Sequence, residues 1–177
     1  MTPFIFALFS MSAMAAPPGS DATPGNHPPQ AARTRTAGSR GLGLGSSTAG
    51  AGISGKYFLT DKTSLQGVLS SWGGWGYSGY VGYRAGLGLN VDYLYEMPVI
   101  VEGDAAELAW NIGGGAGVGF FSSATPPWLA AAAVAGLEVA FKPVPIELVL
   151  EYRPTLWLSP GPAFGLFGAT GHLRYFW

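Results

Sequence analysis

The chain has no cysteine, few charged residues and no excess of positive charge. The absence of cysteine from its 177 residues excludes a disulfide scaffold and a thiolate metal site. Charged residues make up only 11% of the chain and the net charge is −1, whereas nucleic-acid binding requires a concentrated basic surface. We therefore expect no nucleic-acid partner.

A long hydrophobic run is also missing. A transmembrane helix needs about 20 consecutive apolar residues, whereas a transmembrane β-strand needs only about 9–11. The best window, residues 128–141, contains Glu138 and is bounded by Pro127 and Pro143. The chain does contain 28 glycines and 14% aromatic residues, a combination that glycine-rich barrel strands with aromatic girdles explain. The composition therefore favours a membrane barrel over a helical membrane protein.

The first 40 residues are expected to lie outside the folded domain. Residues 4–9 are a short apolar stretch, and Ala13-Met14-Ala15 follows as an A-x-A cleavage site, so residues 1–15 are predicted to be a signal peptide. Residues 16–40 are rich in Pro, Ala, Gly and Thr and have almost no large apolar side chain. Such a segment cannot bury enough surface to fold and is predicted to be a disordered tail.

From Gly41 to Trp177 the chain consists of alternating segments separated by turn residues. Eight segments are expected to be strands: residues 41–46, 49–59, 63–72, 87–95, 107–121, 129–142, 146–158 and 165–177. An even number suits a closed bacterial barrel. The fold class predicted is all-β, an eight-stranded antiparallel up-and-down transmembrane β-barrel.

The connections also alternate in length. Residues 60–62 and 143–145 predict tight turns at one end, and residues 73–86 form the longest connection, at the other end. The short turns are expected to face the periplasm. The connection over residues 96–106 is on the same side and is longer than the short periplasmic turns usual in bacterial barrels.

Alternation within the strands predicts which side chains enter the barrel. In residues 146–158, Leu148 and Leu150 share one face, and Glu147 and Glu151 share the other. Lipid must take the apolar face, because a charge that faces hydrocarbon costs about 2–4 kcal/mol near the midplane. The same sorting predicts a lumen that contains Lys56, Asp92, Glu138, Glu147, Glu151, Arg153, His172 and Arg174.

These charges are expected to pair, since an eight-stranded barrel is just filled by side chains and an unpaired buried charge is strongly unfavourable. A structural salt-bridge plug is the main interpretation, and a polar core that handles protons or ions is the alternative.

A glycine trough is predicted along residues 107–121, where alternate positions lack a side chain on the inner face. Its members are Gly113, Gly115, Gly117 and Gly119. Glycine in a strand often marks a close approach, so the trough is expected to receive large neighbours such as Phe58, Arg153 and Trp157. The alternative is a cavity for a lipid tail or a small ligand.

Aromatic side chains gather in the longest connection. They are Trp72, Trp75, Tyr77, Tyr80 and Tyr83. Aromatics at that height commonly form a belt at the membrane interface. The alternative is a tip that binds an unknown extracellular ligand, a sugar or a protein, through flat rings.

Catalysis and metal binding have little support in the sequence. The only histidines are His27 and His172, and the G-x-S-x-G nucleophile motif is absent. We expect no enzymatic activity, no cofactor and no metal site.

The chain contains three short motifs, Gly52-Ile53-Ser54-Gly55-Lys56-Tyr57-Phe58-Leu59, Glu151-Tyr152-Arg153-Pro154 and Arg174-Tyr175-Phe176-Trp177. They are similar to the patterns G-x-S/T-G-K-Y/W-x-L, E-x-x-P and R-Y-x-F. In these motifs the chain resembles a subgroup, with no established activity, of small bacterial outer-membrane β-barrel proteins of the OmpA/OmpX architecture. The usual terminal residue is Phe, whereas this chain ends in Trp177.

The resemblance covers about residues 41–177. It implies location in the outer membrane, contact with its lipid, and insertion by the barrel-assembly machinery, which would recognise Leu173, Tyr175 and Trp177 in the last strand. A monomer is expected.

Three functions remain open at this point. The first is a non-enzymatic outer-membrane barrel with a filled lumen and a structural or surface-interaction role. The second is a lipid-binding or lipid-modifying barrel that uses the glycine trough. The third is a secreted soluble barrel resembling lipocalins, which would keep apolar side chains inside.

Overall fold

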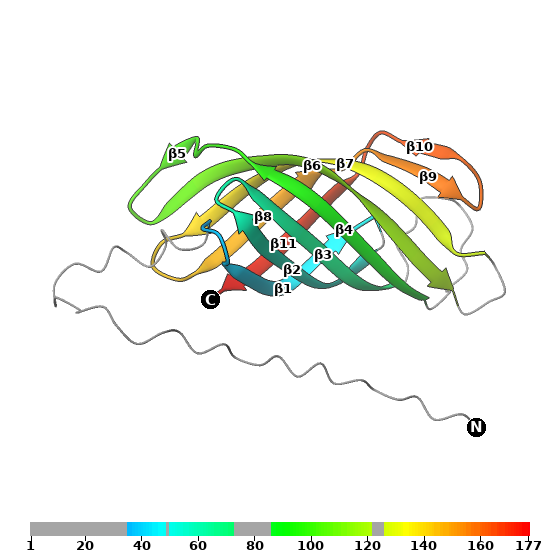
Figure 1. Ribbon diagram of the computed structural model, residues 1–177, viewed down its shortest axis with the longest axis horizontal. Coiled ribbons are helices and arrows are strands. Elements are labelled where there is room, and N and C mark those ends of the chain that lie inside the picture. Colours follow the sequence, from blue (N-terminus) through cyan, green and yellow to red (C-terminus); the bar gives the residue numbers. More distant parts are fainter. Residues whose placement is uncertain (1–34, 49, 73–85, 122–125) are drawn as a thin grey trace, which may run out of the picture.

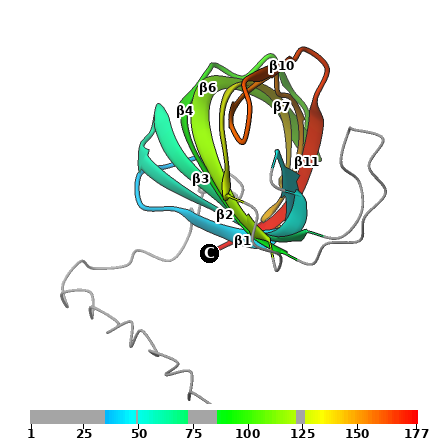
Figure 2. The same ribbon diagram turned by 90° about the vertical axis from the view of Figure 1, so that its right-hand side faces the viewer.

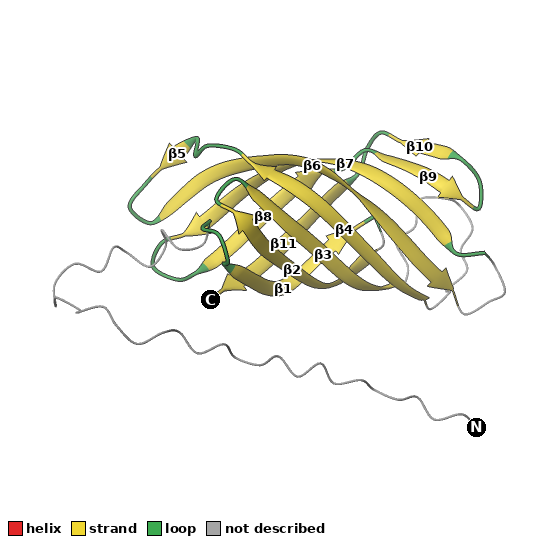
Figure 3. Ribbon diagram, in the orientation of Figure 1, coloured by secondary structure: helices red, strands yellow, loops and turns green. Residues whose placement is uncertain are grey.

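The computed structural model describes residues 35–48, 50–72, 86–121 and 126–177, and every regular element in these ranges is a β-strand (Figures 1 and 3). The strands are β1 (Arg40–Ser47), β2 (Gly50–Thr60), β3 (Thr63–Trp72), β4 (Gly86–Glu96), β5 (Val101–Glu102), β6 (Ala106–Phe121), β7 (Trp128–Phe141), β8 (Ile146–Tyr152), β9 (Thr155–Ser159), β10 (Ala163–Gly165) and β11 (Ala169–Phe176). The all-β prediction is confirmed.

Eight of these strands form a closed barrel, which Figure 2 shows from one end. The order around the wall is β1, β2, β3, β4, β6, β7, β8 and β11, and β11 pairs with β1 to close the ring. Every neighbouring pair is antiparallel. Closure pairs the backbone groups that an open sheet would leave at its edges. The predicted eight-stranded up-and-down topology is therefore confirmed.

The two faces of the wall have opposite chemistry. In β4, Leu87, Leu89 and Val91 point outward and are 62%, 46% and 47% exposed, whereas Asn90 and Asp92 point inward and are 1% and 0% exposed. Successive residues of a strand point to opposite faces, so the alternating sequence produces this separation directly. The interior is polar and the exterior apolar.

Both ends of the described chain lie at one end of the barrel, which we call the terminal end (left in Figure 1). Tight turns between β2 and β3 and between β7 and β8 also lie there, as predicted for residues 60–62 and 143–145. Folded contacts begin before the predicted boundary at Gly41. Arg40 is the first residue of β1, and Gly38 N donates a hydrogen bond of 2.8 Å to the Phe58 carbonyl.

The seventh wall strand is interrupted, which corrects the continuous strand predicted over residues 146–158. The break between β8 and β9 falls at Arg153 and Pro154, since proline has no N–H to donate to a ladder. Neighbouring strands compensate for the break. Arg153 N donates to the Gly168 carbonyl at 2.8 Å, and Ala133 N donates to the Pro154 carbonyl at 3.1 Å. Arg153 still points inward.

The last wall strand was predicted to begin at residue 165. In the structure it begins at Ala169. Residues 163–165 form β10, which pairs with β9. β9 in turn pairs with β7. The chain therefore makes a small hairpin beyond the proline break, opposite the terminal end of the barrel (right in Figure 1), before it enters β11.

The fourth wall strand continues past β4 as β5. Met97 N donates to the Trp110 carbonyl at 2.9 Å, and Ile100 N donates to the Leu108 carbonyl at 2.8 Å, so the chain keeps following β6 through an irregular stretch. The predicted inner connection over residues 96–106 therefore contains a strand, and β5 and the start of β6 extend beyond the rest of the terminal end (Figure 1).

Glycine is required in β1 because β11 approaches it closely. An ideal Cβ at Gly43 would lie 1.9 Å from the backbone carbonyl oxygen of Leu173, far inside van der Waals contact. At Gly161, in the connection between β9 and β10, a Cβ would meet nothing within 4 Å among the described atoms.

We predict that Gly43→Ala destabilises the barrel by about 1–3 kcal/mol or more, because a backbone oxygen cannot move aside without disturbing the ladder. Gly161→Ala is the matched control and should leave stability unchanged. Urea unfolding of both variants, followed by intrinsic fluorescence, measures the difference. Equal midpoints for the two variants would contradict the close approach of β1 and β11.

Candidate functional site: the charged lumen

One group of inward charges surrounds Lys56, and we call it the Lys56 cluster. The ammonium of Lys56 lies 3.0 Å from Glu96 and 3.3 Å from Glu147, and it also donates a hydrogen bond to Glu138. These carboxylates come from β4, β8 and β7, and all three side chains are at most 3% exposed. The Lys56 side chain is itself 0% exposed, so a single ammonium ties three wall strands to β2.

Arg35 adds a second cation to this cluster. Its Nη2 donates hydrogen bonds of 3.1 Å to Glu96 and to the carbonyl of Met97, and its Nε lies 3.7 Å from Glu138. Arg35 falls in the segment predicted to be a tail, and the only local signal was its positive charge. It could not be assigned to the lumen without knowing that the chain folds back over the terminal end.

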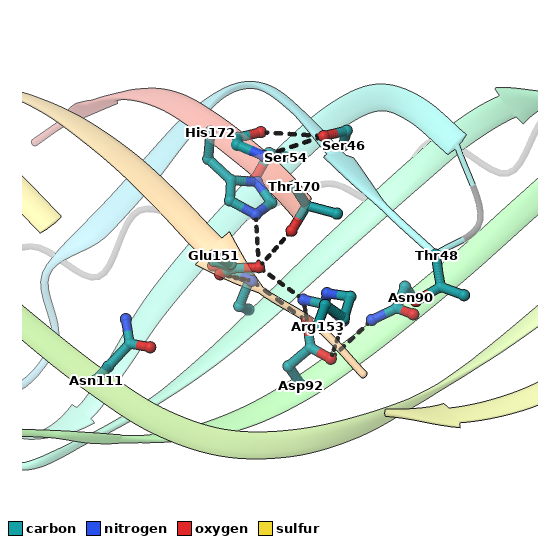
Figure 4. A network of polar contacts seen from close by, with 12 residues as sticks. Ser46, Thr48, Ser54, Asn90, Asp92, Asn111, Glu151, Arg153, Thr170 and His172 are labelled. Atoms are coloured by element: carbon teal, nitrogen blue, oxygen red, sulfur yellow. Dashed lines mark hydrogen bonds and ion pairs between the residues drawn. The ribbon is translucent and has the colours of Figure 1, made fainter. Parts of the chain in front are cut away.

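A second group, the Arg153 cluster, is shown in Figure 4. The guanidinium of Arg153 donates two hydrogen bonds to Asp92, at 2.9 and 2.8 Å, and a third to Glu151 at 2.8 Å. Thr170 donates to Glu151 at 2.9 Å, and Asn90 donates to Asp92 at 2.8 Å. The paired, two-point contact fixes the guanidinium plane as well as its distance.

His172 lies between Ser54 and Glu151 of the Arg153 cluster. Arg174 Nε donates to the Ser54 hydroxyl oxygen at 2.9 Å, and this oxygen lies 3.0 Å from His172 Nδ1. Because a hydroxyl has one donor and two acceptor sites, Ser54 can satisfy either neutral tautomer of His172 while it accepts from Arg174. Nε2 faces Glu151 at 3.2 Å.

This order of serine, histidine and carboxylate is chemically that of a hydrolase triad. Ser54 is however 0% exposed, and its oxygen is already engaged by Arg174. A substrate could not reach it through the barrel wall, so the arrangement fixes the orientation of His172 instead.

Gln66 and Arg174 connect the two clusters. Gln66 donates to Glu151 at 2.8 Å and accepts a hydrogen bond from Arg174. Arg174 also donates to Glu147 at 2.9 Å, which belongs to the Lys56 cluster. The lumen therefore holds one continuous polar network rather than separate ion pairs.

The structure places every predicted lumen residue inside the barrel. Lys56, Asp92, Glu138, Glu147, Glu151, Arg153, His172 and Arg174 are each 3% exposed or less. The prediction counted four acids and three permanent bases. In the described residues the network has five acids and four permanent bases, because Glu96 and Arg35 join it. Glu96 continues the inward alternation of Asn90 and Asp92 in β4. It was missed because the predicted strand ended at residue 95.

The predicted glycine trough is filled, but by other residues than expected. Ideal Cβ atoms at Gly117 and Gly119 would lie 3.1 and 1.8 Å from the indole of Trp128, and one at Gly115 would lie 2.0 Å from the Asp92 carboxylate. Gly113 faces Leu94 of β4 in the same way. Phe58, Arg153 and Trp157 are not the residues that these glycines accommodate. Trp128 was missed because the predicted strand began one residue after it.

β1 supplies a second glycine row with the same purpose. Its inward Gly41, Gly43 and Gly45 pair with Phe176, Arg174 and His172 of β11. A Cβ at Gly45 would lie 2.2 Å from His172 Nδ1. Small residues on one strand thus leave the space that large polar residues on the next strand occupy.

Aromatic pairs lie near both ends of the polar network. Phe58 and Phe176 pack with ring centroids 6.1 Å apart, and both are buried at the terminal end. Trp128 and Trp157 pack edge to face at 5.3 Å at the other end. Apolar rings at the two ends limit the access of water to the charges between them.

The predicted aromatic loop falls largely outside the described residues. Trp75, Tyr77, Tyr80 and Tyr83 all lie outside them, and of Trp72 only the backbone, at the end of β3, is described. Leu173, Tyr175 and Trp177 of the predicted assembly signal lie on the outer face and are 52%, 51% and 65% exposed.

The described residues contain no cluster of His, Asp or Glu arranged to hold a metal ion, and no helix there could cross a bilayer. A groove of about 530 Å³ lies on the outer face around Gly171, bordered by Leu44, Leu148, Leu150 and Leu173. Gly45, Val149 and His172, which occupy inward positions of their strands, also line it.

Comparison of the chain with protein-family models, curated proteins and solved structures found no match.

We predict that Lys56→Met destabilises the protein by about 3–5 kcal/mol, because it leaves three buried carboxylates without their common cation. Lys142→Met is the matched control. Lys142 donates a 2.8 Å hydrogen bond to Glu102, which is 70% exposed, and this contact lowers the pKa of Glu102 below its ordinary value.

The control substitution should leave stability unchanged, since the Glu102 carboxylate remains solvated after the lysine is lost. Denaturant unfolding of both variants tests the prediction. A Lys56→Met barrel as stable as Lys142→Met would show that the cluster does not hold the wall strands together.

Proposed function

We propose that the protein is an outer-membrane β-barrel whose lumen is plugged by paired charges and whose role is structural or surface-directed. The observation that carries this proposal is the sidedness of the closed wall. Charged and amide side chains fill the inside, and large apolar side chains cover the outside. Water would penalise such an exterior, whereas a bilayer matches it.

The exposed apolar surface has the dimensions of a membrane band. In β4 the outward residues run from Leu87 to Tyr95. With about 3.3 Å per residue and a strand tilt of about 40°, this run spans roughly 20 Å of height, close to the 25 Å band of bacterial barrels. The band continues around the ring because each wall strand contributes outward apolar residues.

An aromatic girdle at the terminal end supports the same proposal. Outward aromatic residues cluster near the ends of β2, β4, β7 and β11; they are Tyr57, Tyr93, Tyr95, Phe141, Tyr175 and Trp177. Each is between 39% and 65% exposed. Tyr and Trp favour the membrane–water boundary, where the ring is apolar and its polar edge stays hydrated.

The short turns at the terminal end support an orientation in which that end faces the periplasm. Both ends of the described chain then lie on the side from which the barrel-assembly machinery would approach. The resemblance of the last strand to an assembly signal agrees with this orientation. Contact with outer-membrane lipid and a monomeric state belong to the same proposal.

The two other hypotheses fit the geometry less well. A lipocalin-like soluble barrel needs an apolar interior and a polar surface, the inverse of this wall. A lipid-binding or lipid-modifying barrel that uses the glycine trough would need space inside it, and Trp128 and Asp92 fill that space. The plugged interior instead directs any interaction to the outer surface or to the connections.

The proposal is tested by expressing the full chain in a Gram-negative host. We expect it in the outer-membrane fraction, with faster gel migration before heating than after, as folded membrane barrels show. Recovery as a soluble periplasmic protein would overturn the proposal.

Val91→Arg sharpens this test, because Val91 lies at the centre of the outward run of β4. Facing hydrocarbon, the new charge should cost about 2–4 kcal/mol of folding free energy in phospholipid vesicles. Gly161→Arg, in a connection beyond the wall, is the control and should be neutral. Equal stability of the two variants would contradict a lipid-facing wall.

A further inference from the structure

β5 and the residues before it form an apolar surface that the barrel wall does not require. Val99, Ile100 and Val101 are 40%, 55% and 57% exposed, and we call these three residues the β5 lip. In the described chain, β5 pairs only with β6. A tight turn would suffice to join β4 to β6, so the longer connection calls for an explanation.

The pairing register makes the lip a continuation of the outer surface. Val101 lies opposite Leu108 of β6, and Leu108 lies opposite Val139 of β7. Directly opposed residues share a face of a sheet. The same row continues to Leu148 of β8 and Leu173 of β11, both on the outer wall. Val101 therefore extends the outer apolar row past the end of β4.

The charge distribution leaves this face apolar. Glu102 belongs to the opposite face, because it pairs with Glu107 of β6, and Lys142 binds it at 2.8 Å. A groove of about 330 Å³ lies where the chain enters β6 and turns from β7 into β8, lined by Ala105, Phe141, Pro143, Val144 and Ile146. Its apolar lining includes the girdle residue Phe141.

We propose that the β5 lip inserts into the inner leaflet of the outer membrane, at the boundary between phospholipid headgroups and acyl chains. The inference rests on the proposed function. A phospholipid surface fits the lip because its side chains are small to medium and uncharged, and because Val101 continues the lipid-facing row. A two-residue strand edge offers too few backbone groups to bind an added strand of another protein.

The consequence is an asymmetric anchor. At the terminal end, the β5 lip exposes apolar side chains, whereas the β2–β3 turn exposes Asp61 and Lys62. A barrel with one taller side is expected to tilt so that this side enters the bilayer more deeply.

The absence of cysteine permits a direct test with single labels. Val99→Cys and Val101→Cys place a bimane fluorophore on the lip, Leu150→Cys places it on the wall, and Lys62→Cys places it on the opposite turn. Each full-length variant is folded into phosphatidylcholine vesicles that contain a lipid with a nitroxide quencher near the headgroup. Heat-modifiable gel migration confirms folding before measurement.

Both lip labels should lose emission to an extent similar to the wall label, and the Lys62 label should lose little. If the wall label is quenched and both lip labels behave like the Lys62 label, the lip inference fails and the proposed function stands. If the wall label is also unquenched, the proposed function fails. A third outcome is that the lip labels are protected from the quencher only at a high protein-to-lipid ratio and that chains become cross-linked. A second copy of the chain would then cover the lip, and the inference would be overturned.

Discussion

The buried pairing of Arg153 with Asp92 and Glu151 is the interaction on which the rest of the barrel depends. Strand alternation sends every second residue into a narrow interior, and apolar residues occupy the other face, so an inward charge has no alternative position. Removing such a charge from water is costly unless a partner and further hydrogen bonds compensate. The closed ring supplies them by bringing β4 and β8 together across the lumen, with Arg153 donating two hydrogen bonds to Asp92. Closure and charge pairing therefore require each other.

The glycines follow from the same constraint. Arg174, His172 and Trp128 are too large to share an eight-stranded interior with full-sized neighbours on every strand. Inward glycines on β1 and β6 provide the space: a Cβ at Gly45 would lie 2.2 Å from His172, and one at Gly119 would lie 1.8 Å from Trp128. A filled lumen of this kind is rigid and has little room for a ligand. We therefore expect other molecules to contact the outer surface, which includes the wall, the girdle and the β5 lip.

Much of this arrangement is predictable from period-two alternation alone. It located the eight wall strands and all eight of the predicted lumen residues, since burial of a side chain in a strand depends mainly on parity. Parity cannot predict a break such as the one at Pro154, where compensation comes from the Gly168 carbonyl and the Ala133 N–H of neighbouring strands. It also cannot place Arg35, whose position depends on the chain folding back to Glu96. The occupant of the trough was missed because the predicted strand began at residue 129, one residue after Trp128, which lies opposite Gly119.

The most direct test of the account is a double-mutant cycle on Asp92 and Arg153. Free energies of unfolding are measured for Asp92→Asn, Arg153→Met and the double variant in the same lipid or detergent. The account predicts that the double variant is more stable than the sum of the two single losses implies, with a coupling energy of about 0.5–3 kcal/mol for groups in contact. Strictly additive losses would contradict it, because they would mean that the two side chains do not meet inside one closed barrel.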